Sequence, residues 1–374
     1  MSYTNGLENP ELYFNTVVFT GDVVDGDGTY HDQAVTGVGF QPNLLWHKGV
    51  TGARPHYLVD SVRGQGGSPT EMKHISSSAT AAETTTNTNG HIKSLDSDGW
   101  TAVSGSDSSS RANNSCLNGE NYVGWCWKAS GSTASNTNGT NITSTVSANT
   151  TSGFSIVSWT GDNSGSSTVG HGLGKTAEFV VIKNLADAAN WQVKHKNNSA
   201  NASQSLDATD GESSRAGSTN GGIADLSGTT TFGFIAGSAG VPAANGASDA
   251  MIAYVWNSVQ GYSKFGTYTG NNNADGTFLY LGFRPAYLMV KKIDGADSWT
   301  VLDKERSPFN PVDDQLYANS NDAEADANVC DFLSNGVKFR GNGGSYNGNG
   351  NDYIYMAFAE QPFVNSNGVP NNAR

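Results

Sequence analysis

A chain of 374 residues is long enough for several domains, and its net charge of −13, with no run of Lys or Arg, excludes a nucleic-acid-binding surface and adhesion to an anionic membrane. The 46 glycines are roughly twice the average share, and the 15% of charged residues is well below the usual quarter. Such a composition is typical of short strands joined by many turns.

The N-terminus has no basic start followed by an apolar stretch, and eighteen apolar residues never run together. We therefore expect no signal peptide and no membrane insertion. The three cysteines, Cys116, Cys126 and Cys330, have neither CxxC spacing nor paired histidines nearby. We expect no disulfide framework, zinc site or other cofactor, and we interpret Cys126 as a buried thiol in a reducing cytoplasm.

The first distinctive segment is an acidic turn that carries Asp22, Asp25 and Asp27, with Asp32 following. Calcium needs six to eight oxygen ligands, and no Glu stands where an EF-hand loop requires one. We interpret the segment as a solvated hairpin turn, with a calcium site at Asp22, Asp25 and Asp27 as the alternative. We expect no metal site elsewhere.

An apolar run follows this turn and recurs twice, as NLLWHK, EFVVIK and YLMVKK. Each run is short, rich in aliphatic residues and bounded by turn residues, which predicts a central strand buried on both faces. The runs end in Lys48, Lys183 and Lys292, which we expect at the solvent rim.

Proline and glycine mark the turns around these strands. Pro42 and Pro285 precede the first and third runs, so each is expected in an opening turn, with the strand starting after it. Asp98-Gly99 and Asn335-Gly336 stand between apolar segments, which is the strongest short-range signature of a β-hairpin.

Three similar copies make up the chain. Each has an aromatic-Thr-Gly step, the apolar run, and a closing strand after Asn-Gly or Asn-Gly-Asn. The order predicts an all-β chain of three tandem antiparallel β-sandwich domains with three separate cores, of jelly-roll or lectin-like form. Their ranges are 1–128, 151–260 and 261–374, with a Ser/Thr/Asn-rich linker at 129–150.

The linker contains NITSTVS, which could form an edge strand instead. The second copy passes into the third through residues 258–261 alone, so we expect these two domains to be held in a fixed relation.

Two tryptophans are candidates for binding. Trp191 and Trp299 stand at equivalent positions of the second and third copies. An exposed Trp can stack on a sugar ring, whereas recurrence at one repeat position favours a structural role.

A long segment from Glu305 to Asp326 carries the other candidates. A long loop on a rigid scaffold often serves recognition, and the alternative is that Pro308 and Pro311 steer it across a neighbouring domain. The candidate binding residues in it are Arg306, Asn310, Asp313, Asp314 and Tyr317.

Catalytic motifs do not occur in the sequence. It has no Gly-x-Ser-x-Gly elbow and no phosphate-binding glycine loop after a strand, and its seven histidines do not pair at metal spacing. Hydrolysis would need two carboxylates facing each other, for which the undirected candidates are Asp60, Glu120, Asp303, Glu305 and Glu360. We expect no enzyme.

Several strings carry a family resemblance: NPELYFNT, GVGFQPNLLWHK, SATAAETTT, YVGWCWKAS, GYSKFGTYTGN, SPFNPVDDQLYANS and YIYMAFAEQPF. Together they resemble repeat-built virion proteins of tailed bacteriophages, especially marine and cyanobacterial ones. The resemblance spans nearly the whole chain. It implies a structural role, domains like the jelly rolls of concanavalin-type lectins, and no catalytic residue. The second copy departs from the pattern at residues 173–175.

We therefore expect a virion component made in the host cytoplasm, first a tail fibre or tail-tip protein contributing to host attachment. Its expected partners are other virion proteins, further copies in a homotrimer, and a host surface glycan. The alternatives are a head fibre or capsid decoration protein, and a carbohydrate-binding module without catalysis.

Overall fold

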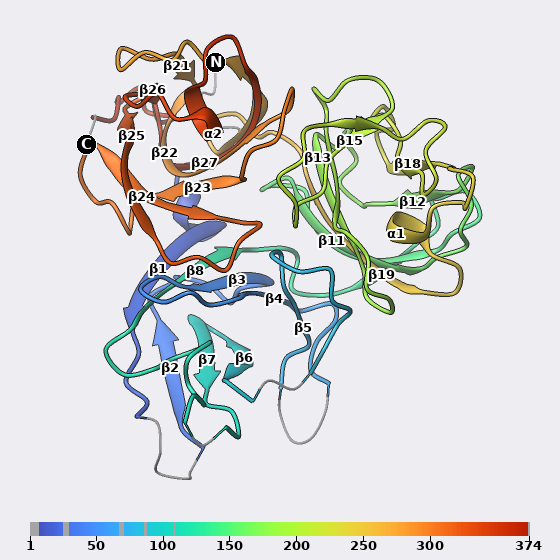
Figure 1. Ribbon diagram of the computed structural model, residues 1–374, viewed down its shortest axis with the longest axis horizontal. Helices are drawn as coiled ribbons and strands as arrows, with labels where there is room; N and C mark the ends of the chain where they lie inside the picture. The colour runs from blue at the N-terminus through green and yellow to red at the C-terminus, as the bar shows by residue number, and fades with distance from the viewer. Residues whose placement is uncertain (1–6, 25–29, 67–70, 86–87, 108, 373–374) are drawn as a thin grey trace.

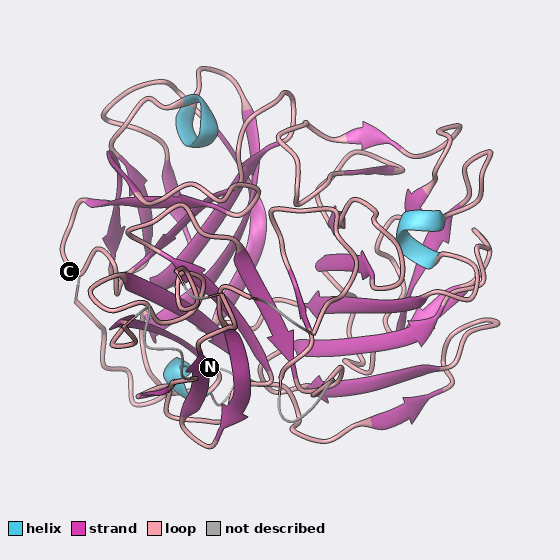
Figure 2. Cartoon of the chain, turned by 60° about the horizontal axis from the view of Figure 1, so that its bottom comes forward, coloured by secondary structure: helices cyan, strands magenta, loops and turns pink. Residues whose placement is uncertain are grey.

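The computed structural model describes residues 7–24, 30–66, 71–85, 88–107 and 109–372, and these form an all-β fold of antiparallel sheets. Figure 1 shows the strands gathered in three lobes that meet at the centre of the molecule, and Figure 2 shows how little helix accompanies them. In the described part of the chain, no helix is long and apolar enough to cross a membrane. The short helices are η1 (Pro10–Leu12), α1 (Pro242–Asn245) and α2 (Gly344–Asn347).

The first copy builds a main sheet in the order β1-β8-β3-β4-β5 and a second sheet in the order β2-β7-β6. Asp98-Gly99 joins β6 to β7, which confirms this hairpin prediction. The strands are β1 (Phe14–Thr20), β2 (Asp32–Thr36), β3 (Leu44–Gly49), β4 (His56–Asp60), β5 (His74–Ile75), β6 (His91–Asp96), β7 (Gly99–Val103) and β8 (Asn121–Trp127).

The second copy builds a main sheet in the order β14-β13-β19-β11-β10-β9, a second sheet in the order β12-β18-β17, and the short pair β15-β16. The strands are β9 (Ala134–Asn136), β10 (Ser144–Asn149), β11 (Phe154–Thr160), β12 (Thr168–Gly170), β13 (Phe179–Asn184), β14 (Gln192–His195), β15 (Ala202–Ser203), β16 (Ser213–Ser214), β17 (Gly222–Ile223), β18 (Thr231–Ile235) and β19 (Ala250–Trp256).

The third copy forms a single sheet in the order β20-β27-β22-β23-β24-β25-β26-β21. Asn335-Gly336 joins β25 to β26, as the hairpin signature predicts. The strands are β20 (Ser263–Thr269), β21 (Phe278–Tyr280), β22 (Phe283–Lys292), β23 (Thr300–Asp303), β24 (Val312–Tyr317), β25 (Ala325–Leu333), β26 (Gly336–Phe339) and β27 (Asp352–Pro362).

Two local predictions were wrong, the linker at 129–150, where the alternative of an edge strand holds, and the opening turn at Pro285. Residues 129–150 are not a free linker, because β9 and β10 lie in them and pair as the edge of the second main sheet. The β-branched residues of this segment therefore outweigh its Ser/Thr/Asn composition. Pro285 lies inside β22 and not before it, at a place where the register to β27 shifts, and such an irregularity accommodates the missing N–H.

The hydrophobic core also differs from the expected three separate cores. Each copy has a core of its own, and a fourth and larger cluster, the shared core, takes residues from all three copies, among them Trp125, Tyr254 and Met356. Alternation along β8 explains this arrangement: Trp125 and Trp127 lie in the shared core, whereas Cys126 lies in the first copy's own core. The central strands are therefore buried on both faces, as predicted.

The three copies contact one another in cyclic order. A loop of each copy packs on the next, forming a first junction (76–85 on the second copy), a second junction (205–212 on the third copy) and a third junction (318–324 on the first copy). At each junction the backbone N–H of a glutamate donates to a backbone carbonyl of the next copy. These bonds are Glu83 N to Leu185 O (3.0 Å), Glu212 N to Ile293 O (2.8 Å) and Glu324 N to Val50 O (2.9 Å).

Two of the three lysines expected at the solvent rim, Lys48 and Lys183, lie buried in these junctions, and Lys291 lies buried at the second junction. Each donates to a carbonyl of the loop that covers it, and burial lowers the pKa of all three, to about 7 for Lys48 and about 8 for Lys183 and Lys291. In the third copy Lys291 takes this place, and Lys292 is half-buried. The bonds are Lys183 Nζ to Thr80 O (2.9 Å), Lys291 Nζ to Thr209 O (3.0 Å) and Lys48 Nζ to Asn321 O (3.4 Å).

Candidate functional site

The two tryptophans proposed as sugar platforms are buried, with 0% of Trp191 and 1% of Trp299 exposed. The indole of Trp191 donates to Ser76 O (2.8 Å) across the first junction, and the indole of Trp299 donates to Ser205 O (3.0 Å) across the second. Their recurrence reflects a repeated interlock between copies, so neither side chain can stack on an external sugar in this structure.

His56 takes the equivalent place at the third junction. Its Nδ1 accepts from the indole of Trp46 (2.8 Å), and its Nε2 lies 3.0 Å from Tyr317 O and 3.1 Å from Ser320 O. A neutral ring with its proton on Nε2 satisfies all three contacts. Burial, assisted by the charge of Lys48, holds the pKa of His56 well below its usual value, which agrees with a neutral ring.

The segment Glu305–Asp326 is likewise structural and is not a free loop, because it contains β24 and the start of β25. The Arg306 side chain is 1% exposed and pairs with Asp303 (2.7 Å) and Glu324 (2.7 Å). These carboxylates raise the pKa of Arg306 despite the cost of burial.

The other candidates in this segment serve the same fold. The Asn310 side chain exchanges two hydrogen bonds with the backbone of Phe332. Asp313 and Asp314 are half-exposed and accept from the hydroxyl of Ser307, and the half-exposed Tyr317 offers its carbonyl to His56. The alternative that this segment covers a neighbouring repeat is therefore the one that agrees with the geometry.

The alternative calcium site cannot be assembled from what the structure describes. Asp25 and Asp27 lie outside the described residues, and Asp22 and Asp32 are exposed. Asp32 pairs with Lys93. Among the described residues, no group of three or more His, Cys, Asp or Glu side chains could hold a metal ion.

The undirected carboxylates are ion-pair partners, and Glu305 and Glu360 share one cation, Lys304 (3.4 and 3.6 Å). Asp60 and Asp303 are buried beside arginines of their own copies, Glu120 pairs with Arg54 (2.6 Å), and Glu360 pairs with Arg284 (2.8 Å). None of these carboxylates lines the pocket described next, and Glu360 lines a second hollow with Glu8 and Glu11.

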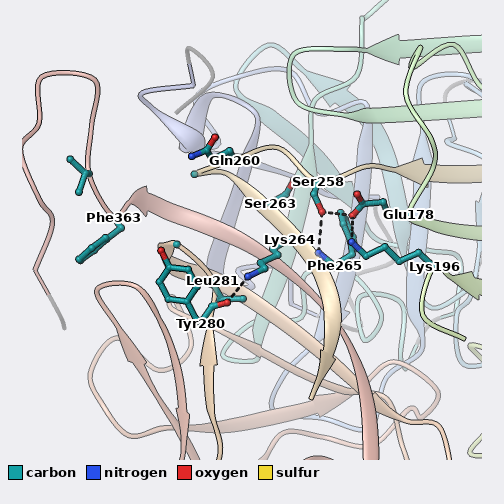
Figure 3. Close-up of a pocket in the computed structure, with 13 residues that line it drawn as sticks. Glu178, Lys196, Ser258, Gln260, Ser263, Lys264, Phe265, Tyr280, Leu281 and Phe363 are labelled. Carbon is teal, nitrogen blue, oxygen red and sulfur yellow. Dashed lines mark hydrogen bonds and ion pairs between the residues drawn. The ribbon is translucent and has the colours of Figure 1, made fainter. Parts of the chain in front are cut away.

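A pocket of about 720 Å³ opens where the second copy passes into the third, a volume in the usual range for small-molecule sites. We call it the junction pocket. Its walls come from the connector 258–261, the start of β20, the end of β21 and the chain after β27 (Figure 3). Gly261 makes the turn of the connector with a φ of +78°, which favours glycine.

One wall of the junction pocket carries an ion pair. Lys196 Nζ lies 2.9 Å from Glu178 Oε2, and the hydroxyl of Ser258 donates to the same oxygen. The side chains of Lys196 and Glu178 are 35% and 23% exposed, so this pair faces solvent. The three residues are held by the end of β14, the start of β13 and the connector, which brings the polar groups together.

The opposite wall is aromatic (Figure 3). Tyr280 is 53% exposed, and the half-exposed Phe363 and the buried Leu281 line the same side. Lys264 lies between the walls: its Nζ donates to Tyr280 O (2.7 Å) and stands 5.2 Å from the centre of the Tyr280 ring. Burial, together with the charge of Lys196, lowers the pKa of Lys264.

Sequence reasoning did not find the junction pocket, because its residues come from five separate stretches of the chain. Only the connector at 258–261 marked the place, as a short link that holds two copies in a fixed relation. Tyr280 lies in an aromatic strand pattern that normally indicates buried residues, so its exposure was not predicted.

The match to a family model covers residues 9–362, and the family is described as a domain of unknown function, DUF7483. No curated protein and no solved structure matches the chain. The matched region contains all three copies, their junctions and most of the residues around the junction pocket. The chain belongs to the DUF7483 family.

Proposed function

We propose that this protein is a structural, non-catalytic component of a bacteriophage virion, a tail fibre or tail-tip protein that contributes to host attachment. The observation that supports this role best is the cyclic interlock: equivalent Glu amides, buried lysines and indole or imidazole groups of each copy bond to the neighbouring copy. Together with the shared core, these contacts make one rigid body from three copies.

A rigid body built from backbone-directed contacts suits a particle component better than an enzyme that must open and close. We take each copy to be a jelly-roll domain of the lectin-like kind, with boundaries at 128 and 260, so that the second copy includes β9 and β10. The resemblance to phage virion proteins supports the same role.

The position on the particle is tested by imaging. Antibody-gold labelling of intact particles should place the protein at the tail fibre or tail tip. Label over the head would reject this position and support the alternative of a head fibre or decoration protein. Absence of label from purified, intact particles would overturn the virion role.

The oligomeric state is a separate proposal. We propose a homotrimer that binds other virion proteins, with a light-scattering mass three times that of one chain. A monomer at micromolar concentration would reject the trimer. The three copies within one chain would then be the feature that could bind a partner with threefold symmetry.

A carbohydrate-binding module is the second candidate, and the junction pocket favours it. An exposed tyrosine facing charged and amide groups is a suitable arrangement for a polar ligand with apolar faces.

A further inference from the structure

We propose that the junction pocket is a binding site for an acidic saccharide, one whose sugar carries a carboxylate, such as a uronic acid unit of a surface polysaccharide. The inference deepens the proposed attachment role and rests on it for the source of the ligand. The binding step itself depends only on the pocket.

The charge of the pocket selects an anion. Lys196 and Lys264 face one carboxylate, Glu178, so the pocket has a surplus positive charge in a chain of net charge −13. The charge of Lys196 acts on Lys264, and an anion between the two ammonium groups relieves this repulsion. Each ammonium has donors beyond the bond described for it, because a lysine carries three.

A second hollow shows that this surplus is local. It has a volume of about 390 Å³ and lies where the chain after β27 meets the N-terminal segment. Glu8, Glu11 and Glu360 line it. No described lysine or arginine lines the second hollow, so it offers an acidic ligand no cationic partner, whereas the junction pocket offers two lysines.

The aromatic wall selects a sugar over a simple anion. Tyr280 and Phe363 present apolar ring surface on one side of the charged groups, and Gln260 adds an exposed amide at the rim. A pyranose ring has an apolar face that packs on an aromatic ring and hydroxyl groups that bond to amides. Inorganic sulfate or phosphate would use the lysines and leave this wall unused.

Calorimetric titration of the full chain tests the inference, with a hexuronate oligosaccharide, a neutral oligosaccharide of equal length and inorganic sulfate as probes. We expect saturable binding of the hexuronate and binding of the other two at least about tenfold weaker. Lys264→Gln and Tyr280→Ala should each weaken hexuronate binding about tenfold. Lys175→Gln, at an exposed lysine outside the pocket, should bind like the wild type.

Three results would overturn the inference: no hexuronate binding at millimolar concentration, sulfate binding as tight as hexuronate binding, or unchanged affinity in both pocket variants. Tyr280→Ala alters an exposed side chain, so it remains informative if Lys264→Gln does not fold. Failure here is distinct from failure of the virion role, because the imaging experiment does not depend on a ligand.

Discussion

The first and third junctions are built around a buried ion pair, whereas the second is not. Asp60 and Arg63 pair in the first copy and reach the Tyr254 hydroxyl of the second, and Asp303 and Arg306 pair in the third copy, where Asp303 accepts from the indole of Trp125 in the first (3.0 Å). At the second junction the place of the aspartate is taken by the buried His195.

The backbone contacts of the three junctions agree even though these side chains differ. The charge pairs are therefore not what makes one copy recognise the next. Pairing two charges inside a protein contributes little net stability, whereas removing one partner leaves the other charge buried and unpaired. The junctions should consequently differ in which substitution or change of pH lowers their stability most.

Asp303→Ala is expected to have the largest effect, because it leaves Arg306 buried beside Glu324 alone. The free energy of unfolding should fall by about 3–5 kcal/mol, measured by urea denaturation. Asp187→Ala, at an exposed position, serves as the control and should change stability by less than about 0.5 kcal/mol. A loss of under about 1 kcal/mol for Asp303→Ala would show that the pair is not the weak point we infer.

A double substitution sharpens the same contrast. Replacing the pair by apolar residues, Asp303→Leu with Arg306→Met, should recover most of the stability that Asp303→Ala loses.

Among the described residues the second junction has no such pair, and acid should destabilise it through His195, as acid should also destabilise the third junction through His56. Burial lowers the pKa of His195 to about 3, from 6.5 in an unfolded chain. Between these values the unfolded state binds a proton that the folded state does not, so stability falls as the pH drops below about 6.5. At pH 5 this single histidine should cost about 2 kcal/mol relative to pH 8.

His195→Gln should remove this contribution. The difference in unfolding free energy between pH 8 and pH 5 should then be smaller in the variant than in the wild type by about 2 kcal/mol. Identical pH dependence in the two proteins would show that His195 is not held neutral.

The sequence predicted what depends on local pattern and missed what depends on contacts between copies. Period-two alternation and turn residues predicted the all-β class and both hairpins. The prediction of a linker failed because it gave the Ser/Thr/Asn-rich composition more weight than the β-branched residues that pair in β10. Lys183 was predicted to be exposed. A lysine at the end of an apolar run looks the same in the sequence whether its ammonium donates to water or to a carbonyl of another copy.

The same limit applied to the candidate site. Recurrence correctly favoured a structural role for Trp191, yet only the structure shows its partner, a carbonyl of another copy. The junction pocket combines residues that lie nearly two hundred positions apart in the chain, and no sequence motif predicts that they come together.

The smallest predicted effect concerns one hydrogen bond of the first junction. Trp191→Phe keeps an aromatic ring in the shared core but loses the N–H that donates to Ser76 O, and this part-buried carbonyl is then left without the indole donor. Trp256→Phe is a matched control, because Trp256 lies in the same core and its buried indole N–H has no partner among the described residues. Thermal or urea unfolding should show that Trp191→Phe costs about 1–2 kcal/mol more than Trp256→Phe. Equal losses would mean that the indole of Trp191 contributes volume alone, and the interlock would then depend on the Glu amides and buried lysines that all three junctions share.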